Sequence, residues 1–129
     1  MVKKSACIFI SGSGTNLRSI IKSSRDYNFP INVRLVISNK KSAGGICFAK
    51  KFSIPYLVLN FKNEKFEKIA IKELISRKIK LVCLAGFMSI LSKNFVRNFK
   101  GKIINIHPSL LPKYKGLNTF ARVLNDKEK

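Results

Sequence analysis

Residues 63–85 read NEKFEKIAIKELISRKIKLVCLA and predict a helix followed by a buried strand. Its first part has apolar side chains at helical spacing with lysine and glutamate between them, which predicts an amphipathic helix over residues 63–77. The expected apolar face consists of Phe66, Ile69, Ala70 and Leu74. Residues 81–85 are apolar at every position, as in a strand buried on both faces. A helix followed by such a strand is typical of an α/β fold with a parallel sheet.

The same alternation extends in both directions along the chain. Strands are predicted over residues 6–10, 33–37, 56–59, 81–85 and 103–106. Helices are predicted over residues 15–23, 43–52, 63–77, 92–99 and 120–124, with Ser92 able to cap the fourth of them. We therefore expect residues 1–129 to form one domain with an open, doubly wound, mostly parallel sheet. In that arrangement the strand over residues 81–85 lies beside the strand over residues 6–10.

The net charge of +20 is extreme for 129 residues. Such a charge indicates either a nucleic-acid partner or a composition biased toward lysine, asparagine, isoleucine and phenylalanine. The lysines are scattered along every segment and do not form one stripe with aromatic residues between them, which favours the second interpretation. We therefore expect small anionic substrates and no nucleic-acid partner.

The hydrophobic runs and cysteines restrict the class of protein further. No apolar run reaches about 18 residues, and the run over residues 6–10 is too short for a signal peptide, so we expect a cytoplasmic protein outside the membrane. Cys7, Cys47 and Cys83 lie far apart and lack the spacing of metal ligands, so no metal site is expected. Cys7 and Cys83 fall in apolar runs, where a thiol packs as a small hydrophobic group.

A glycine-rich turn, residues 11–17 with the sequence SGSGTNL, follows the first predicted strand. Glycines let the backbone approach a ligand, and the free N–H groups of the following helix attract a phosphate. The alternative is a plain turn with a serine or threonine cap. Leu17 replaces the third glycine of a dinucleotide motif, and no acidic residue ends the second strand, so a single phosphate on a ribose fits better than NAD or ATP.

A second motif, residues 85–91 with the sequence AGFMSIL, follows the fourth predicted strand. Because that strand should neighbour the first one, the segment borders the same crevice. Its apolar side chains and exposed backbone could hold a flat heterocycle, although an ordinary apolar turn is an equal alternative.

The third motif, residues 104–112 with the sequence INIHPSLLP, ends the fifth predicted strand. Strand alternation places Asn105 and His107 on the same side. A lone histidine is most often structural, but an amide beside an imidazole also suits acyl transfer, because the amide can stabilise an oxyanion while the imidazole moves protons. No serine or cysteine nucleophile is evident, so direct attack by a substrate amine is the expected chemistry.

Together these motifs resemble the folate-dependent formyltransferases, and the resemblance runs along the whole chain. The third motif is shared with the methionyl-tRNA type of this family. Its continuation, residues 113–119 with the sequence KYKGLNT, and the glycine-rich turn are similar to the phosphoribosylglycinamide type. The resemblance implies formyl transfer from 10-formyltetrahydrofolate to glycinamide ribonucleotide in purine synthesis. Another formyltransferase of the methionyl-tRNA type, or an inactive nucleotide-binding remnant, remains an alternative.

The resemblance also implies residue roles. Catalysis would fall to His107, as the acid, and to Asn105, which would contact the formyl group. The substrate phosphate would be bound by Gly14, Thr15 and Asn16. The folate would contact a set of residues comprising Asn63, Met88, Ser89, Ile90, Leu91 and Asn105.

The chain departs from this family in three respects. Ser89 and Asn63 stand where the family often has arginine, which weakens the expected folate contacts. Family members also continue to a loop whose aspartate tunes the catalytic histidine, and to further strands. We therefore expect an N-terminal portion with impaired activity, present as a monomer, a homodimer or a complex with a complementing C-terminal fragment.

Overall fold

Five parallel strands form the central layer of the computed structural model, which describes residues 3–12, 15–41, 43–60 and 64–106. The strands are β1 (Lys4–Ile10), β2 (Ile31–Ser38), β3 (Tyr56–Val58), β4 (Leu81–Leu84) and β5 (Lys102–Asn105). Their order across the sheet is β3-β2-β1-β4-β5. The predicted parallel α/β sheet is therefore confirmed, including the placement of β4 beside β1.

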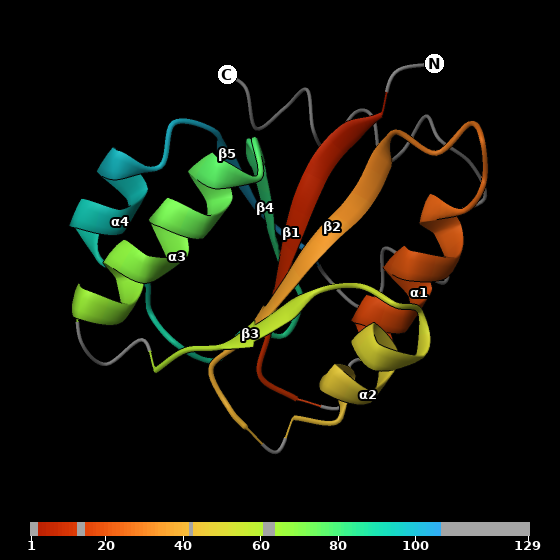
Figure 1. Ribbon diagram of the computed structural model, residues 1–129, viewed down its shortest axis with the longest axis horizontal. Helices are drawn as coiled ribbons and strands as arrows, with labels where there is room; N and C mark the ends of the chain where they lie inside the picture. The colour runs from red at the N-terminus through yellow and green to blue at the C-terminus, as the bar shows by residue number, and fades with distance from the viewer. Residues whose placement is uncertain (1–2, 13–14, 42, 61–63, 107–129) are drawn as a thin grey trace.

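Helices cover both faces of this sheet (Figure 1). They are α1 (Thr15–Ser24), α2 (Gly45–Lys51), α3 (Glu64–Ser76) and α4 (Lys93–Asn98). The pair α1 and α2 lies on one side, and the pair α3 and α4 lies on the other (Figure 1). This is the doubly wound arrangement that the alternation of strands and helices indicates.

Strand β1 carries the two hydrophobic cores of the domain. Its residues 6–10 are fully buried, and they alternate between the two faces. Ala6, Ile8 and Ile10 belong to the core beneath α1 and α2, whereas Cys7 and Phe9 belong to the core beneath α3 and α4. Fully burying an isoleucine or phenylalanine side chain contributes about 1.5–3 kcal/mol, so this strand is a main source of stability.

The strand and helix ends differ from the prediction by a few residues. Strand β1 begins two residues earlier, because Lys4 and Ser5 pair with Ile31 and Asn32 through their backbones. Helix α2 is shorter than residues 43–52, and its N-cap, Gly44, makes no side-chain capping bond. The expected loop and the helix over residues 120–124 lie outside the described residues.

The predicted apolar face of α3 is wrong at one position. Ile69 is 37% exposed, whereas Glu67 is only 5% exposed and faces α4. The Glu67 carboxylate accepts hydrogen bonds from the backbone N–H of Ser92 at 2.9 Å and from its hydroxyl at 2.5 Å. The Ser92 oxygen in turn accepts the N–H of Phe95 at 3.1 Å and so caps α4, as predicted. The buried carboxylate is stabilised by these bonds.

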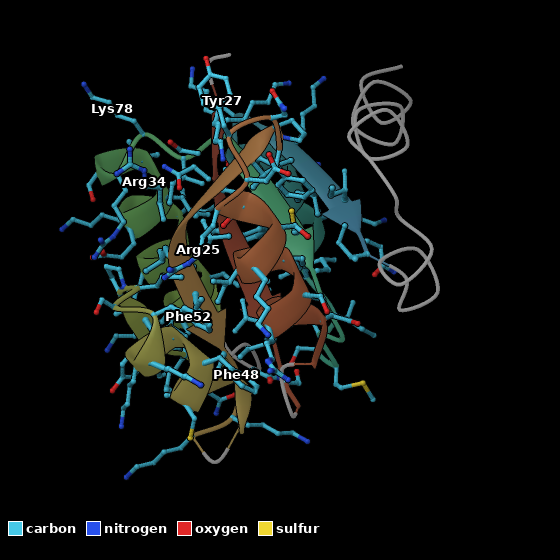
Figure 2. The ribbon with its side chains drawn as sticks, turned by 90° about the vertical axis from the view of Figure 1, so that its right-hand side faces the viewer. Arg25, Tyr27, Arg34, Phe48, Phe52 and Lys78 are labelled. Atoms are coloured by element: carbon cyan, nitrogen blue, oxygen red, sulfur yellow. The ribbon has the colours of Figure 1, made fainter. Side chains whose placement is uncertain are left out.

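Two arginine side chains lie over phenylalanine rings at the surface. The guanidinium carbon of Arg25, just after α1, is 4.7 Å from the ring centroid of Phe52 (Figure 2). Arg18 lies over Phe48 at 5.8 Å. These cation–π contacts join α1 and its C-terminal turn to α2, and each contributes about 0.5–1 kcal/mol at an exposed site.

The predicted burial of Cys7 and Cys83 is confirmed. Cys7 and Cys83 are buried, and Cys47 is exposed. Burial raises the pKa of the Cys83 thiol to about 12. Burial also raises the pKa of Cys7, with a further contribution from Cys83. Within the described ranges, no helix is both long enough and apolar enough to cross a bilayer.

Candidate functional site

The carboxyl ends of four neighbouring strands meet at one edge of the sheet. Strands β2, β1, β4 and β5 end there with Ser38, Ile10, Leu84 and Asn105. Open α/β sheets bind ligands in the crevice at this edge, where the connections to the helices diverge. The described parts of the three sequence motifs lie at this edge.

The glycine-rich turn connects β1 to α1 at this edge. Ser11 is 4% exposed, while no atom of the described neighbours lies within 4 Å of the position that a Cβ on Gly12 would occupy. Helix α1 then starts at Thr15 and carries no acidic residue in its first turn, so nothing there competes with an incoming anion. Asn16 is half-buried in this first turn, and Gly14 lies outside the described residues.

A chain of hydrogen bonds joins this turn to the ends of β2 and β4. The Ser11 hydroxyl donates to Oδ1 of Asn39 at 2.5 Å, and its oxygen accepts the backbone N–H of Met88 at 2.7 Å. Nδ2 of Asn39 donates to the hydroxyl of Ser89 at 2.5 Å. Three segments distant in sequence are thereby held together by side chains; we call Ser11, Asn39 and Ser89 the polar clamp.

The segment after β4 turns away from the sheet at Gly86, whose φ of 71° lies in the left-handed region that favours glycine. The ring of Phe87 packs edge-on against Phe9, with centroids 5.2 Å apart. Met88 and Ile90 are 76% and 91% exposed, so two apolar side chains project beside the crevice. Leu91 is half-buried and packs against the core beneath α3 and α4.

Asn105 ends β5, which is an edge strand among the described residues. Its side chain is exposed, whereas the preceding Ile104 is fully buried. Asn105 pairs with Leu84, the last residue of β4, so it neighbours the start of the segment after β4. His107 and Asn63 lie outside the described residues, and their proposed roles stay predictions.

Asn39 also lies at the carboxyl edge of the sheet, but it belongs to none of the three sequence motifs. It directly follows β2, a strand adjacent to β1, and therefore lies at the same edge. A polar side chain at the carboxyl end of each neighbouring strand is the signal that could have identified it. In the described part of the chain, no group of three or more His, Cys, Asp or Glu side chains could hold a metal ion.

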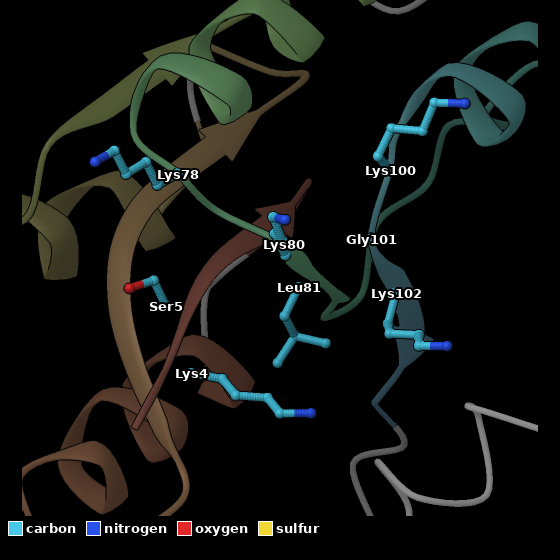
Figure 3. A pocket seen from close by; sticks show the side chains of 8 residues that line it. All are labelled: Lys4, Ser5, Lys78, Lys80, Leu81, Lys100, Gly101 and Lys102. Atoms are coloured by element: carbon cyan, nitrogen blue, oxygen red, sulfur yellow. The ribbon is translucent and has the colours of Figure 1, made fainter. Parts of the chain in front are cut away.

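A cavity of about 420 Å³ lies at the opposite edge of the sheet, near the amino ends of β1, β4 and β5 (Figure 3). We call it the basic cavity; it is lined by Lys4, Ser5, Lys78, Lys80, Leu81, Lys100, Gly101 and Lys102. None of these residues is acidic. Because the glycine-rich turn lies at the carboxyl edge, this cavity is separate from the expected phosphate site.

The sequence matches known proteins along nearly its whole length. The family model described as formyl transferase matches residues 4–129. A phosphoribosylglycinamide formyltransferase from Haemophilus influenzae is 45% identical over 125 residues, which cover 94% of this chain and 59% of that protein. The trifunctional purine biosynthetic protein adenosine-3 of Bos taurus is 43% identical over 127 residues, covering 95% of this chain and 13% of that protein.

The fold matches a solved structure as well. The crystal structure of phosphoribosylglycinamide formyltransferase from Brucella melitensis superposes with a TM-score of 0.76 and 36% identity. The superposition covers 97% of this chain and 67% of that one. This chain therefore spans about three fifths to two thirds of the length of these single-function relatives.

Proposed function

Because this chain belongs to the formyl transferase family, we propose that it transfers a formyl group from 10-formyltetrahydrofolate to the amine of glycinamide ribonucleotide. The activity named for its relatives supports this proposal. The observation that carries the proposal is the carboxyl edge of the sheet. There the glycine-rich turn, the segment after β4 and Asn105 emerge from neighbouring strands.

The phosphate of the ribonucleotide would bind at the start of α1. Thr15 and Asn16 open α1, and Gly14 precedes them in the sequence. The first N–H groups of a helix have no partner within the helix, and the helix dipole favours an anion there. The absence of an acidic residue in this turn supports the assignment. The high positive charge of the chain would also raise the rate of encounter with a phosphate.

The folate would bind along residues 88–91, with Asn63 and Asn105 at its borders. The exposed side chains of Met88 and Ile90 offer apolar surface for a flat ring, and Ser89 lies between them. A heterocycle such as a pterin can also bond to backbone N–H and C=O groups. Such backbone contacts do not depend on the arginines that Ser89 and Asn63 replace.

The reaction needs a donor for the carbonyl oxygen and a group that moves a proton. Attack by the substrate amine forms a bond to the formyl carbon and places negative charge on its oxygen, which the amide N–H of Asn105 would stabilise. The bond from this carbon to N10 of the folate then breaks. His107 would take the proton from the attacking amine and deliver it to N10, which balances the transfer.

The assay that tests this proposal follows formyl transfer to glycinamide ribonucleotide. It uses the chain alone and the chain mixed with the C-terminal part of the Haemophilus influenzae relative. We expect transfer in at least one of the two mixtures, because a neighbouring carboxylate orients a catalytic histidine and the C-terminal part can supply one. Added C-terminal part should raise turnover. Transfer in neither mixture would contradict the proposed function.

Two substitutions locate the chemistry in the active mixture. Asn105→Ala and His107→Ala should each lower turnover on the order of 10²-fold, because a preorganised group that acts in the transition state is lost. Asn98→Ala is the control, since Asn98 is exposed at the end of α4. If both variants retain the turnover of the control, the chemistry lies elsewhere.

A further inference from the structure

The polar clamp fixes the position of the irregular segment after β4. Residues 85–92 form neither helix nor strand, and Met88 and Ile90 are largely exposed. The backbone N–H of Met88 donates to Ser11 at 2.7 Å, and the Ser89 hydroxyl accepts from Asn39 at 2.5 Å. These two consecutive residues are therefore tied to the ends of β1 and β2.

The main effect of the polar clamp is on the position of residues 88–91 and not on the stability of the fold. Ser11 is 4% exposed, but Asn39 and Ser89 are half-buried. The bond between Asn39 and Ser89 joins two half-buried neutral groups and contributes little to stability, because water replaces it when it is lost. Its position nevertheless decides where the backbone of residues 88–91 lies.

The backbone of β2 holds Asn39 in register with β1. Its N–H donates to the carbonyl of Ile10 at 3.3 Å, and the neighbouring Ser38 side chain is fully buried and bonded to both backbone groups of Lys40. Asn39 thus has a fixed base and a side chain that reaches two other segments. Such a supported side chain can hold a binding segment to within the tolerance that recognition requires.

We propose that Ser11 and Asn39 are positioning residues for the folate co-substrate. In this role they act through the backbone of Met88 and the side chain of Ser89. This inference rests on the proposed function, since it assigns the folate to residues 88–91. It goes further by making the folate affinity depend on two side chains from the ends of β1 and β2.

The test compares variants that differ in one hydroxyl. Ser11→Thr and Ser11→Val have nearly the same shape, but only threonine can bond to Met88 and Asn39. Asn39→Ala removes the link to Ser89, and Asn98→Ala is an exposed control. For each variant, calorimetry measures binding of 10-formyltetrahydrofolate and of glycinamide ribonucleotide, and hydrogen exchange measures protection of the Met88 amide without ligand.

We expect Ser11→Val and Asn39→Ala to weaken folate binding on the order of tenfold, the effect of losing one or two modest hydrogen bonds. In Asn39→Ala, which lies outside the glycine-rich turn, binding of glycinamide ribonucleotide should change by less than about twofold, which is less than the effect of one typical hydrogen bond. Ser11→Thr should restore folate binding and Met88 protection relative to Ser11→Val. Equal folate affinity in Ser11→Thr and Ser11→Val would overturn this inference alone, whereas absence of folate binding by the unmodified chain would overturn the proposed function as well.

Discussion

Gly101 directly precedes β5, and its replacement by alanine should strongly destabilise the fold. A Cβ at this position would lie 2.2 Å from the carbonyl oxygen of Lys80 and 2.7 Å from the ring of Phe99. Carbon atoms in contact prefer separations of about 3.5–4.0 Å, so the start of β5 must move by more than about 1 Å. That movement would break the hydrogen bond from Lys102 N–H to the Lys80 carbonyl, now 2.8 Å.

The magnitude follows from these two losses. Overpacking costs about 1–3 kcal/mol, and the lost backbone bond adds about 1 kcal/mol. Gly101→Ala should therefore lower the free energy of unfolding by about 2–4 kcal/mol. Gly12→Ala is the matched control, because no atom from the described part of the chain lies within 4 Å of its added Cβ. Its stability should change by less than about 0.5 kcal/mol.

Urea unfolding followed by circular dichroism measures both variants. A lower midpoint with an unchanged slope for Gly101→Ala reports lost stability rather than a changed denatured state. If Gly101→Ala unfolds at the same midpoint as Gly12→Ala, the close approach of β5 to Lys80 is not a real constraint. The placement of Asn105 by β5 would then be in doubt.

Three further predictions concern other parts of the molecule. Glu67→Ala should lower the free energy of unfolding in urea by about 2–4 kcal/mol, because the half-buried N–H and hydroxyl of Ser92 lose their acceptor. Glu67→Gln should cost less, because one acceptor oxygen remains. Equal stability of the two variants would refute this prediction. At pH 8 iodoacetamide should modify the exposed Cys47 quickly. Cys7 and Cys83 should react only after unfolding, because both thiols are buried and burial raises their pKa values, which keeps them protonated up to higher pH. Rapid labelling of all three cysteines in mass spectrometry would contradict this prediction. The melting temperature should rise with added salt, because anions relieve repulsion among the five lysines of the basic cavity. At equal ionic strength it should rise more with tripolyphosphate. Replacing three of these lysines with glutamine should remove the extra rise with tripolyphosphate, and an unchanged rise would show that general screening is its source.

Strands β1 and β4 are predictable because residues 6–10 and 81–85 are continuous apolar runs. The pairing of residues 6–10 with residues 81–85 follows from the alternation of strands and helices, since doubly wound sheets place such strands side by side. The extension of β1 to Lys4 and Ser5 is not predictable in the same way. Those residues join the sheet through backbone pairing with β2, which their polar side chains do not reveal.

The errors in α3 and at the site have a common cause. Helical periodicity identifies the side of α3 that faces the sheet, but Glu67 is buried because the N-terminus of α4 approaches it and supplies hydrogen bonds. In the same way Asn39 gains a role only because Ser11 and Ser89 lie within its reach. Contacts between polar groups distant in sequence depend on tertiary placement, which hydrophobic patterning does not encode.

The carboxyl edge of this sheet is the proposed binding site for the substrates of a formyltransferase. Calorimetric titration with glycinamide ribonucleotide, and with the riboside that lacks its phosphate, is the decisive measurement. Saturable one-to-one binding of the ribonucleotide is expected, with much weaker binding of the riboside and of the ribonucleotide to a folded Gly14→Val variant, whose side chain would occupy the approach to α1. Equal affinity for ribonucleotide and riboside, or undiminished binding by Gly14→Val, would contradict the claim.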